Sequence, residues 1–101
     1  MTEIFQTEEF SEWVSGLKDR SARARIQARI DRLAMGNPGD VAPIGKGRSE
    51  MRIHYGPGYR VYYMKKGNVI VVLLCGGDKS TQNDDIMRAH ELADSWEKLS
   101  T

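Results

Sequence analysis

Cations and aromatic side chains alternate with apolar ones along a predicted β-hairpin in the middle of the chain. Its strands span residues 48–55 and 59–66 and flank a Gly-Pro-Gly turn. A three-residue turn places Tyr55 opposite Tyr59 and His54 opposite Arg60. Side chains alternate between the two faces of a strand. One face therefore carries an apolar set: Met51, Ile53, Tyr55, Tyr59, Val61 and Tyr63. The other face carries Arg52, His54, Arg60, Tyr62 and Met64.

The second face combines positive charge with an aromatic ring, which is what a phosphate-and-base ligand requires. Arginine stays charged and forms two parallel hydrogen bonds to phosphate oxygens. Histidine ordinarily titrates near neutrality, so His54 is the natural proton carrier, and Tyr62 is predicted to stack on a base. The alternative for Arg60 is an ion pair with Glu50 or with an acidic helix residue. The alternative for Arg52, His54 and Tyr62 is an ordinary surface or packing role.

Charge is strongly segregated along the chain, although the net charge is only +1. Residues 20–66 carry eleven Lys or Arg against three Asp or Glu, whereas residues 1–19 carry one against five and residues 67–101 carry three against six. A basic block of this kind indicates a polyanionic partner met on one side. The alternative is that the basic block pairs with the acidic ends of the same chain.

Length and composition restrict the possible classes of protein. At 101 residues the chain predicts a single domain, residues 1–101, with one sizeable core. There is no apolar run of 18 residues and no visible secretory signal, so we expect no membrane span and a cytoplasmic location. The lone Cys75 allows no intrachain disulfide and is typical of a reducing compartment. With one Cys and only His54 and His90 as nitrogen ligands, we expect no metal site and no cofactor.

Hydrophobic periodicity predicts an α+β fold with the order β-α-α-β-β-β-β-α, give or take one strand. We expect an antiparallel twisted sheet of four to five strands, with an N-terminal helix hairpin and a C-terminal helix packed on one face. The expected elements are a strand at 4–6, a helix from Thr7 or Glu8, a helix after residues 19–21, a strand or link at 41–47, the hairpin, a strand at 69–75 and a helix to about Leu99.

Three further details concern packing. The segment 69–75 is apolar throughout, which predicts a central strand buried on both faces. Gly76 and Gly77 follow it and are expected to permit a sharp exit of the backbone. Trp13 and Trp96 are expected to anchor the core.

Several motifs together resemble a known group of proteins. They are Ser-Glu-Met-Arg-Ile at 49–53, Gly-Pro-Gly-Tyr-Arg-Val-Tyr-Tyr at 56–63, Leu-Cys-Gly-Gly-Asp-Lys-Ser-Thr-Gln at 74–82, and Asp85-Ile86 with Ala89. With the order of elements, they resemble the RelE/ParE superfamily of toxins from type II toxin–antitoxin modules, and especially its HigB-like, phage Gp49-like branch of addiction module killer proteins. The resemblance spans nearly the whole chain and implies a RelE-like sheet.

The resemblance also implies a function. RelE-like toxins bind the ribosomal A site and cut mRNA, whereas ParE-like toxins poison DNA gyrase, and a co-encoded antitoxin silences both kinds. The antitoxin expected here is a helix-turn-helix, HigA-like protein, and operator DNA is contacted only through it. The positions that match the RelE-like catalytic residues are Arg52, His54, Arg60 and Lys79. The family's catalytic Tyr near the start of the last helix has no equivalent, since Ile86 and Met87 occupy that region.

Metal-independent RNA cleavage uses the 2′-OH as nucleophile and leaves a 2′,3′-cyclic phosphate. In this interpretation Arg60 stabilises the transition state, Arg52 holds the same or the adjacent phosphate, and His54 carries the proton. Lys79 binds phosphate or protonates the leaving oxygen, unless it is an ordinary turn lysine. Five helical arginines are expected to dock on ribosomal RNA, or else form a solvated face: Arg20, Arg23, Arg25, Arg29 and Arg32. The alternatives for the whole chain are a gyrase inhibitor and an inactive member that only binds its antitoxin.

Overall fold

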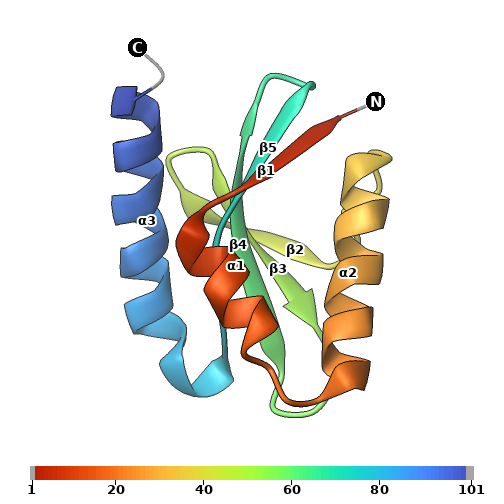
Figure 1. Cartoon of the computed structure of the whole chain (residues 1–101). Coiled ribbons are helices and arrows are strands. Elements are labelled where there is room, and N and C mark those ends of the chain that lie inside the picture. The colour runs from red at the N-terminus through yellow and green to blue at the C-terminus, as the bar shows by residue number, and fades with distance from the viewer. Residues whose placement is uncertain (1, 100–101) are drawn as a thin grey trace.

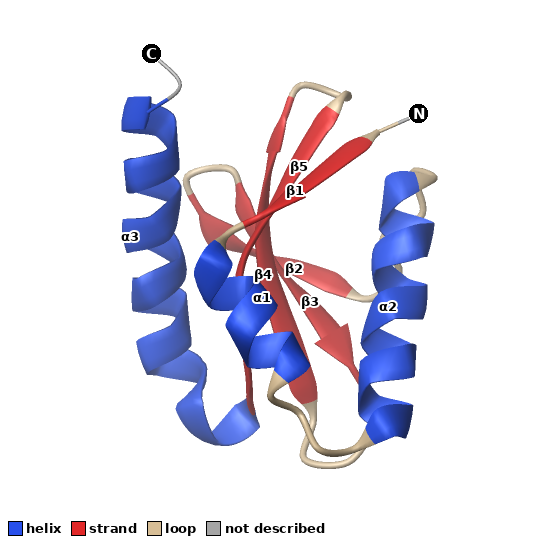
Figure 2. Ribbon diagram, in the orientation of Figure 1, coloured by secondary structure: helices blue, strands red, loops and turns tan. Residues whose placement is uncertain are grey.

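The structure is a computed structural model that describes residues 2–99. In chain order its elements are β1 (Glu3–Gln6), α1 (Glu8–Ser15), α2 (Arg20–Ala34), β2 (Val41–Gly45), β3 (Arg48–Ile53), β4 (Tyr59–Lys66), β5 (Ile70–Asp78), the single 3-10 turn η1 (Lys79–Thr81) and α3 (Gln82–Leu99). They form an α+β fold with α3 on one side of the sheet and α2 on the other (Figure 1, Figure 2). No helix within residues 2–99 combines the length and the apolar character needed to cross a membrane.

The five strands lie side by side in the order β1-β5-β4-β3-β2. Neighbours are antiparallel except that β1 runs parallel to β5, with Glu3 opposite Ile70 and Gln6 opposite Leu73. The sheet is therefore mixed, and the expectation of an antiparallel sheet is wrong for its first strand. The reason is the connection: the chain leaves β1 through two helices and reaches β5 only after the other strands, and so long a crossover permits a parallel pair.

Each face of the sheet carries its own hydrophobic core. On the face covered by α1 and α2, the core consists of Phe10, Ile26, Ile30, Leu33, Met51, Ile53, Val61, Tyr63, Val71 and Leu73, with Trp13 packed at its edge. On the face covered by α3, it consists of Tyr62, Met64, Val72, Leu74, Cys75, Ala89 and Ala93, with Trp96 packed at its edge. The expectation that all helices share one face is therefore wrong. A strand that is apolar on both faces, as β5 is, needs cover on both.

The first two helices begin where the sequence predicts. Thr7 caps α1: its hydroxyl accepts a hydrogen bond from the N–H of Phe10 at 3.0 Å and donates to the carbonyl of Leu74 at 2.6 Å. Asp19 caps α2 by accepting from the N–H groups of Ser21 and Ala22. These caps satisfy backbone donors that have no partner inside the helix. The cap at Thr7 also fixes the start of α1 to β5.

The predicted division of the hairpin faces is confirmed, although its register is not. The connection spans residues 54–58, and the pairs are Arg52 opposite Arg60 and Ile53 opposite Tyr59. The register therefore differs by two residues from the predicted one. An offset of two residues leaves every side chain on its predicted face. An offset of one residue would turn the side chains of one strand to the opposite face. The consequence for function is that two arginines, rather than an arginine and a histidine, stand directly opposite one another.

Gly76 and Gly77 lie inside β5, which continues to Asp78. A Cβ at Gly76 would stand 2.2 Å from a ring carbon of Trp13, and one at Gly77 would stand 1.9 Å from Asp85 Oδ2. Both residues keep negative or extended φ values outside the left-handed region. The expectation of a sharp exit is therefore wrong: these glycines make room for side chains that lie directly on the strand.

Substituting Gly76→Ala is expected to destabilise the protein by about 1–3 kcal/mol, because the added methyl group overlaps the Trp13 ring. Urea unfolding measures the change in the free energy of unfolding. In a Trp13→Leu background the same glycine substitution is expected to cost clearly less, since the overlapping ring is gone. An equal cost in both backgrounds would show that the ring does not require this glycine.

Candidate functional site

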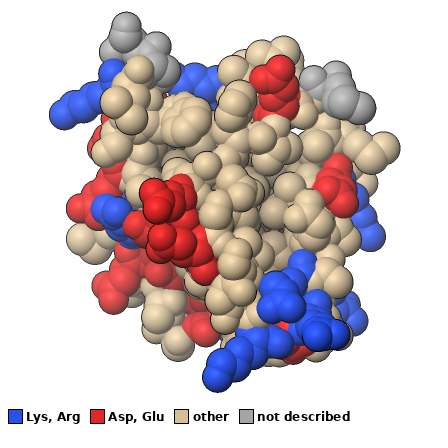
Figure 3. All heavy atoms as spheres, viewed as in Figure 1, with Lys and Arg blue, Asp and Glu red and all other residues tan. Residues whose placement is uncertain are grey.

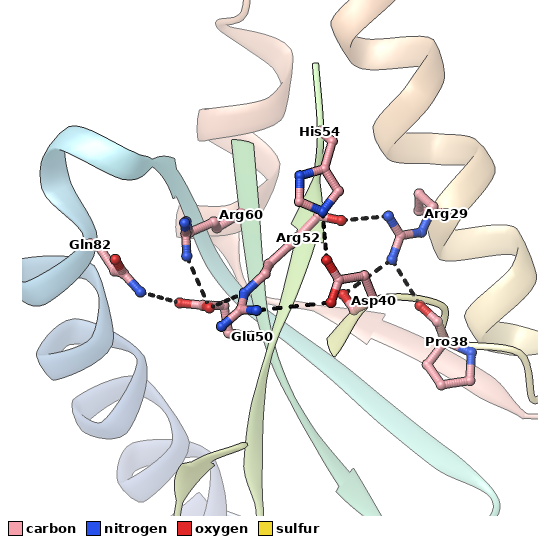
Figure 4. Close-up of polar contacts among 8 residues, drawn as sticks. All are labelled: Arg29, Pro38, Asp40, Glu50, Arg52, His54, Arg60 and Gln82. Carbon is pink, nitrogen blue, oxygen red and sulfur yellow. Dashed lines mark hydrogen bonds and ion pairs between the residues drawn. The ribbon is translucent and has the colours of Figure 1, made fainter. Parts of the chain in front are cut away.

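A buried carboxylate joins the two arginines that face each other across the hairpin. Glu50 is 2% exposed, and its Oε2 accepts hydrogen bonds from Arg52 Nε at 2.9 Å and from Arg60 Nη1 at 3.0 Å. Its Oε1 accepts from Gln82 Nε2 at 2.9 Å, which connects the sheet to the start of α3 (Figure 4). We call these four residues the Glu50 cluster.

The geometry of the Glu50 cluster follows from strand alternation. Glu50 and Arg52 are two residues apart on β3 and therefore share a face, and Arg60 on β4 lies opposite Arg52. Glu50 is diagonal to Arg60, within reach of a long side chain. Both guanidiniums can thus bond the same carboxylate oxygen without any irregularity in the strands.

The Glu50 carboxylate stays ionised at neutral pH. Burial acts to raise its pKa, but hydrogen bonds from Arg52, Gln82 and Arg60 and the charge of Arg60 outweigh burial and hold the pKa below its ordinary value. The arginine side chains differ in access, since Arg52 is 39% exposed and Arg60 is 11% exposed. Arg52 is therefore the member that reaches solvent most freely.

Asp40, just before β2, extends the polar contacts from Arg52 to His54. His54 Nε2 lies 2.5 Å from Asp40 Oδ2, and Arg52 Nη1 lies 3.9 Å from Asp40 Oδ1 (Figure 4). The hydrogen bond with His54 is the main reason that the pKa of Asp40 is lowered, and the charge of Arg52 adds to it. With Nε2 donating to Asp40, a neutral His54 keeps Nδ1 as the nitrogen that accepts a proton. His54 itself is 70% exposed.

Arg29 on α2 holds the backbone around Asp40 in place. It donates through Nη1 to the carbonyl of Arg52 at 2.5 Å and through Nη2 to the carbonyls of Pro38 at 2.9 Å and Asp40 at 3.4 Å. Gly39 has a φ of +71°, and a Cβ there would stand 2.8 Å from Arg29 Nη2. The predicted RNA-binding residue Arg29 is thus also a clamp between the helix and the end of β3.

Three of the four predicted catalytic residues lie together: Arg52, Arg60 and His54. The fourth, Lys79, has its methylene carbons across Gly58 in the hairpin connection and shares the lining of a pocket with Gln82. Tyr62 is 0% exposed and its hydroxyl is buried without a hydrogen-bond partner among the described residues. The prediction that Tyr62 stacks on a base is therefore wrong for this structure. Strand alternation predicted the correct sheet face for the Tyr62 side chain, but it could not predict that α3 covers this face.

The remaining predicted RNA-binding arginines lie along α2. Arg25 sits 4.5 Å above the ring of Tyr55, and Arg23 donates to the carbonyl of Leu17. Arg20 and Arg32 are exposed. Among residues 2–99, no carboxylate lies within 4 Å of a guanidinium nitrogen of α2. Other arginines are paired, as Arg48 is with Asp94 of α3.

Charge is also segregated in space. Lys and Arg gather at the lower right of the space-filling view, where α2 begins, whereas Asp and Glu gather at the left, over α1 and α3 (Figure 3). Arg48 does pair with the acidic C-terminal part of the chain, so intramolecular pairing consumes some of the basic block. Within residues 2–99, no arginine of α2 forms an ion pair of this kind.

Comparison with known proteins identifies a close relative of this chain. An uncharacterized protein of Haemophilus influenzae is 50% identical over 91 residues, which cover 90% of this chain and 92% of that protein. The chain belongs to the family of this Haemophilus protein. No protein-family model matches the sequence.

Sequence reasoning missed Asp40 and Gln82 as members of the site. Asp40 stands in a Gly-Asn-Pro-Gly-Asp segment that signals only the end of a helix, and Gln82 stands in a motif that signals only the start of one. Glu50 was considered only as an alternative partner for Arg60. Its spacing of two residues from Arg52 was the available signal for a shared face.

Substituting Glu50→Gln is expected to lower the free energy of unfolding by roughly 3 kcal/mol at pH 7, because two arginines lose their buried counter-charge. The pKa of Glu50 is lower in the folded than in the unfolded protein, so its stabilising effect is complete above the ordinary value of 4.5 and is lost as pH falls through the folded-state pKa. The difference between wild type and variant should therefore shrink in acid. Urea unfolding at pH 7 and pH 3 measures it.

The matched control is Glu91→Gln, which removes a carboxylate that is 68% exposed and meets Arg88 only at the surface. Its effect is expected to stay below about 1 kcal/mol. A Glu50→Gln penalty as small as this, or one that does not change with pH, would contradict the role assigned to the buried carboxylate.

Proposed function

We propose that this protein is a RelE/ParE-superfamily toxin of the HigB-like branch, with a RelE-like fold, and that it cuts mRNA on the ribosome. The observation that carries the proposal is the Glu50 cluster: two guanidiniums on adjacent strands are held by one carboxylate, and His54 is joined to them through Asp40. The mixed five-stranded sheet with its C-terminal helix is consistent with the proposed fold.

The proposed reaction assigns a task to each group. His54 Nδ1 takes the proton of a ribose 2′-OH, and the 2′-oxygen attacks the adjacent phosphorus. The bond from phosphorus to the 5′-oxygen breaks, and a 2′,3′-cyclic phosphate remains. Arg52 and Arg60 stabilise the negative charge that builds up on the phosphoryl oxygens. Glu50 acts as a positioning residue that fixes both guanidiniums before the RNA arrives.

The leaving 5′-oxygen needs a proton from another donor. Lys79 is the cationic side chain at the hairpin connection, exposed to solvent, and it supplies this proton directly or through water. The arginines of α2 dock on ribosomal RNA beside the site. A helix-turn-helix, HigA-like antitoxin neutralises the toxin by covering the basic surface or blocking entry to the ribosomal A site, and this antitoxin alone contacts operator DNA. The proposed location is the cytoplasm.

A gyrase inhibitor of the ParE type is the second candidate. It is favoured by the composition of the first turns of α3, where Ile86 and Met87 stand and no tyrosine is present. In that case Arg52 and Arg60 are contact residues and no RNA is cut. A family member that only binds its antitoxin is the third candidate, favoured by the nearly complete burial of Arg60 in its ion pair.

Incubation with purified ribosomes and mRNA tests the function, with primer extension to map the ends. Cleavage at fixed positions within codons is expected. Intact mRNA together with gyrase-linked DNA breaks would instead favour gyrase inhibition. Harmless overexpression without antitoxin would favour a protein that only binds its antitoxin.

Substituting Arg52→Gln is expected to lower the rate of mRNA cleavage by about 10²-fold, as the loss of one charge-stabilising donor does elsewhere. Arg52 suits this test better than Arg60, because its side chain is 39% exposed whereas that of Arg60 is 11% exposed. Arg88→Gln is the matched control, since Arg88 is similarly exposed and ion-paired but pairs with Glu9 on α1. Equal cleavage by both variants would remove Arg52 from the reaction.

Substituting Asp40→Asn is expected to lower the cleavage rate by roughly 10²-fold or more and to alter its pH profile, because an amide no longer fixes the ring nitrogen of His54 that carries the proton. The rate is measured against pH for both proteins. Asp31→Asn, which changes an exposed aspartate on α2, serves as the control. An unchanged pH profile in the Asp40 variant would separate Asp40 from proton transfer.

A further inference from the structure

A pocket of about 240 Å³ lies between α2 and the end of β3. It is lined by Arg25, Ala28, Arg29, Arg32, Ile53 and His54. Arg52 and Arg60 do not line it, so it is separate from the Glu50 cluster. His54 belongs to its wall and also contacts Asp40, so the pocket and the cluster share one rim. Below we call it the α2 pocket.

The α2 pocket is positively charged. Three arginines line it, and none of them is ion-paired within the described residues 2–99. One carboxylate that interacts with these arginines is that of Asp40. Its charge is felt by Arg29, but its oxygens are engaged with His54 and Arg52. An anion entering the pocket therefore meets cations that form no ion pair with a carboxylate of the described residues.

One of these arginines is already fixed in position. The three hydrogen bonds from Arg29 to backbone carbonyls use three of the five N–H donors of its guanidinium. Carbonyl acceptors hold the group without neutralising its charge. Two N–H groups of the Arg29 guanidinium remain free to bind a ligand. Because Arg29 is already ordered, it loses less conformational entropy on binding than a mobile arginine does.

The other walls of the pocket suit an organic phosphate rather than a bare ion. Ala28 contributes a small apolar side chain from α2, and Ile53 contributes a larger one from β3. A water molecule occupies about 30 Å³ in the liquid, so the pocket has room for a phosphate group with part of an attached sugar. Arg25 lies on the ring of Tyr55, which stiffens one side of the opening.

We propose that the α2 pocket binds a backbone phosphate of single-stranded RNA, one position along the strand from the phosphate held by Arg52 and Arg60. This inference rests on the proposed function, because it takes RNA as the ligand. His54, which the pocket and the cluster share, sets the path of the RNA: the RNA strand runs from α2 across the imidazole of His54 to the Glu50 cluster. Of the α2 arginines assigned above to ribosomal RNA, Arg25, Arg29 and Arg32 thus contact the substrate strand instead, and Arg20 and Arg23 remain for ribosomal RNA.

Binding of a fluorescein-labelled pentaribonucleotide, measured by anisotropy without ribosomes, tests the pocket. Arg32→Gln is expected to weaken binding about tenfold, as the loss of one charge-assisted phosphate contact does. Lys18→Gln removes the same charge from an exposed position just before α2, outside the pocket, and is expected to change affinity less than about twofold. Equal losses in both variants would indicate a diffuse electrostatic field and overturn the pocket.

Two further measurements locate and identify the ligand. Amide chemical shifts in a ¹⁵N spectrum are expected to move at Ala28, Arg29, Arg32 and Ile53 on addition of the oligonucleotide, and shifts confined to other elements would overturn the assignment. Inorganic phosphate is expected to move the same amides at much higher concentration. Saturable binding of phosphate with no binding of the oligonucleotide would show a small-phosphate site and reject RNA as the ligand.

The proposal of an RNA-binding pocket and the proposal of a nuclease can be rejected independently. Pocket-dependent binding of the oligonucleotide without any mRNA cleavage on ribosomes would reject the proposed nuclease and keep the pocket. Cleavage that Arg32→Gln leaves unchanged, with no binding at α2, would reject the pocket and keep the nuclease. Arg32 is exposed, so the variant is expected to fold, and its melting temperature checks this.

Discussion

The ion pair between Glu50 and Arg60 is the constraint on which the polar edge of this sheet depends. Both side chains are almost removed from water, and neither charge could stay buried without the other. Arg52 and Gln82 complete the set of donors to the carboxylate, so the same group also fixes a solvent-accessible guanidinium and the first turn of α3. One buried carboxylate therefore determines where two cations stand and how the last helix meets the sheet.

A second level of organisation surrounds this ion pair. Arg29 ties α2 to the carbonyls of Pro38 and Asp40, and the side chain of Asp40 in turn bonds His54. The exposed histidine is thus held through a chain of contacts that begins on a helix and ends at the strand. The basic charge of α2 lies next to this chain of contacts without acidic partners among the described residues, so the surface attracts anions toward the same edge.

The sequence predicted those features that depend on local pattern. Alternation gave the correct faces for the hairpin, and the caps at Thr7 and Asp19 gave the start of two helices, because these signals lie within a few residues. The parallel pairing of β1, the cover of the second face by α3 and the contact between Asp40 and His54 depend on residues distant in the chain. No local pattern encodes such partners, which is why the burial of Tyr62 was missed.

The glycines of β5 carry a similar lesson. Their spacing after an apolar run reads as an exit signal, but their use depends on Trp13 and Asp85, which approach from two other elements. A missing side chain can serve the backbone or a neighbour, and only the neighbour's position distinguishes these uses.

The parallel placement of β1 has a consequence for how the chain is made. Thr7 is bonded to a carbonyl 67 residues further along, so β1 is synthesised well before the strand with which it pairs. Contacts so remote in sequence close slowly, since loop entropy opposes them until the intervening segments are ordered. The sheet of the growing polypeptide thus lacks its parallel pair until β5 has been synthesised, and β1 stays without its partner strand for that time.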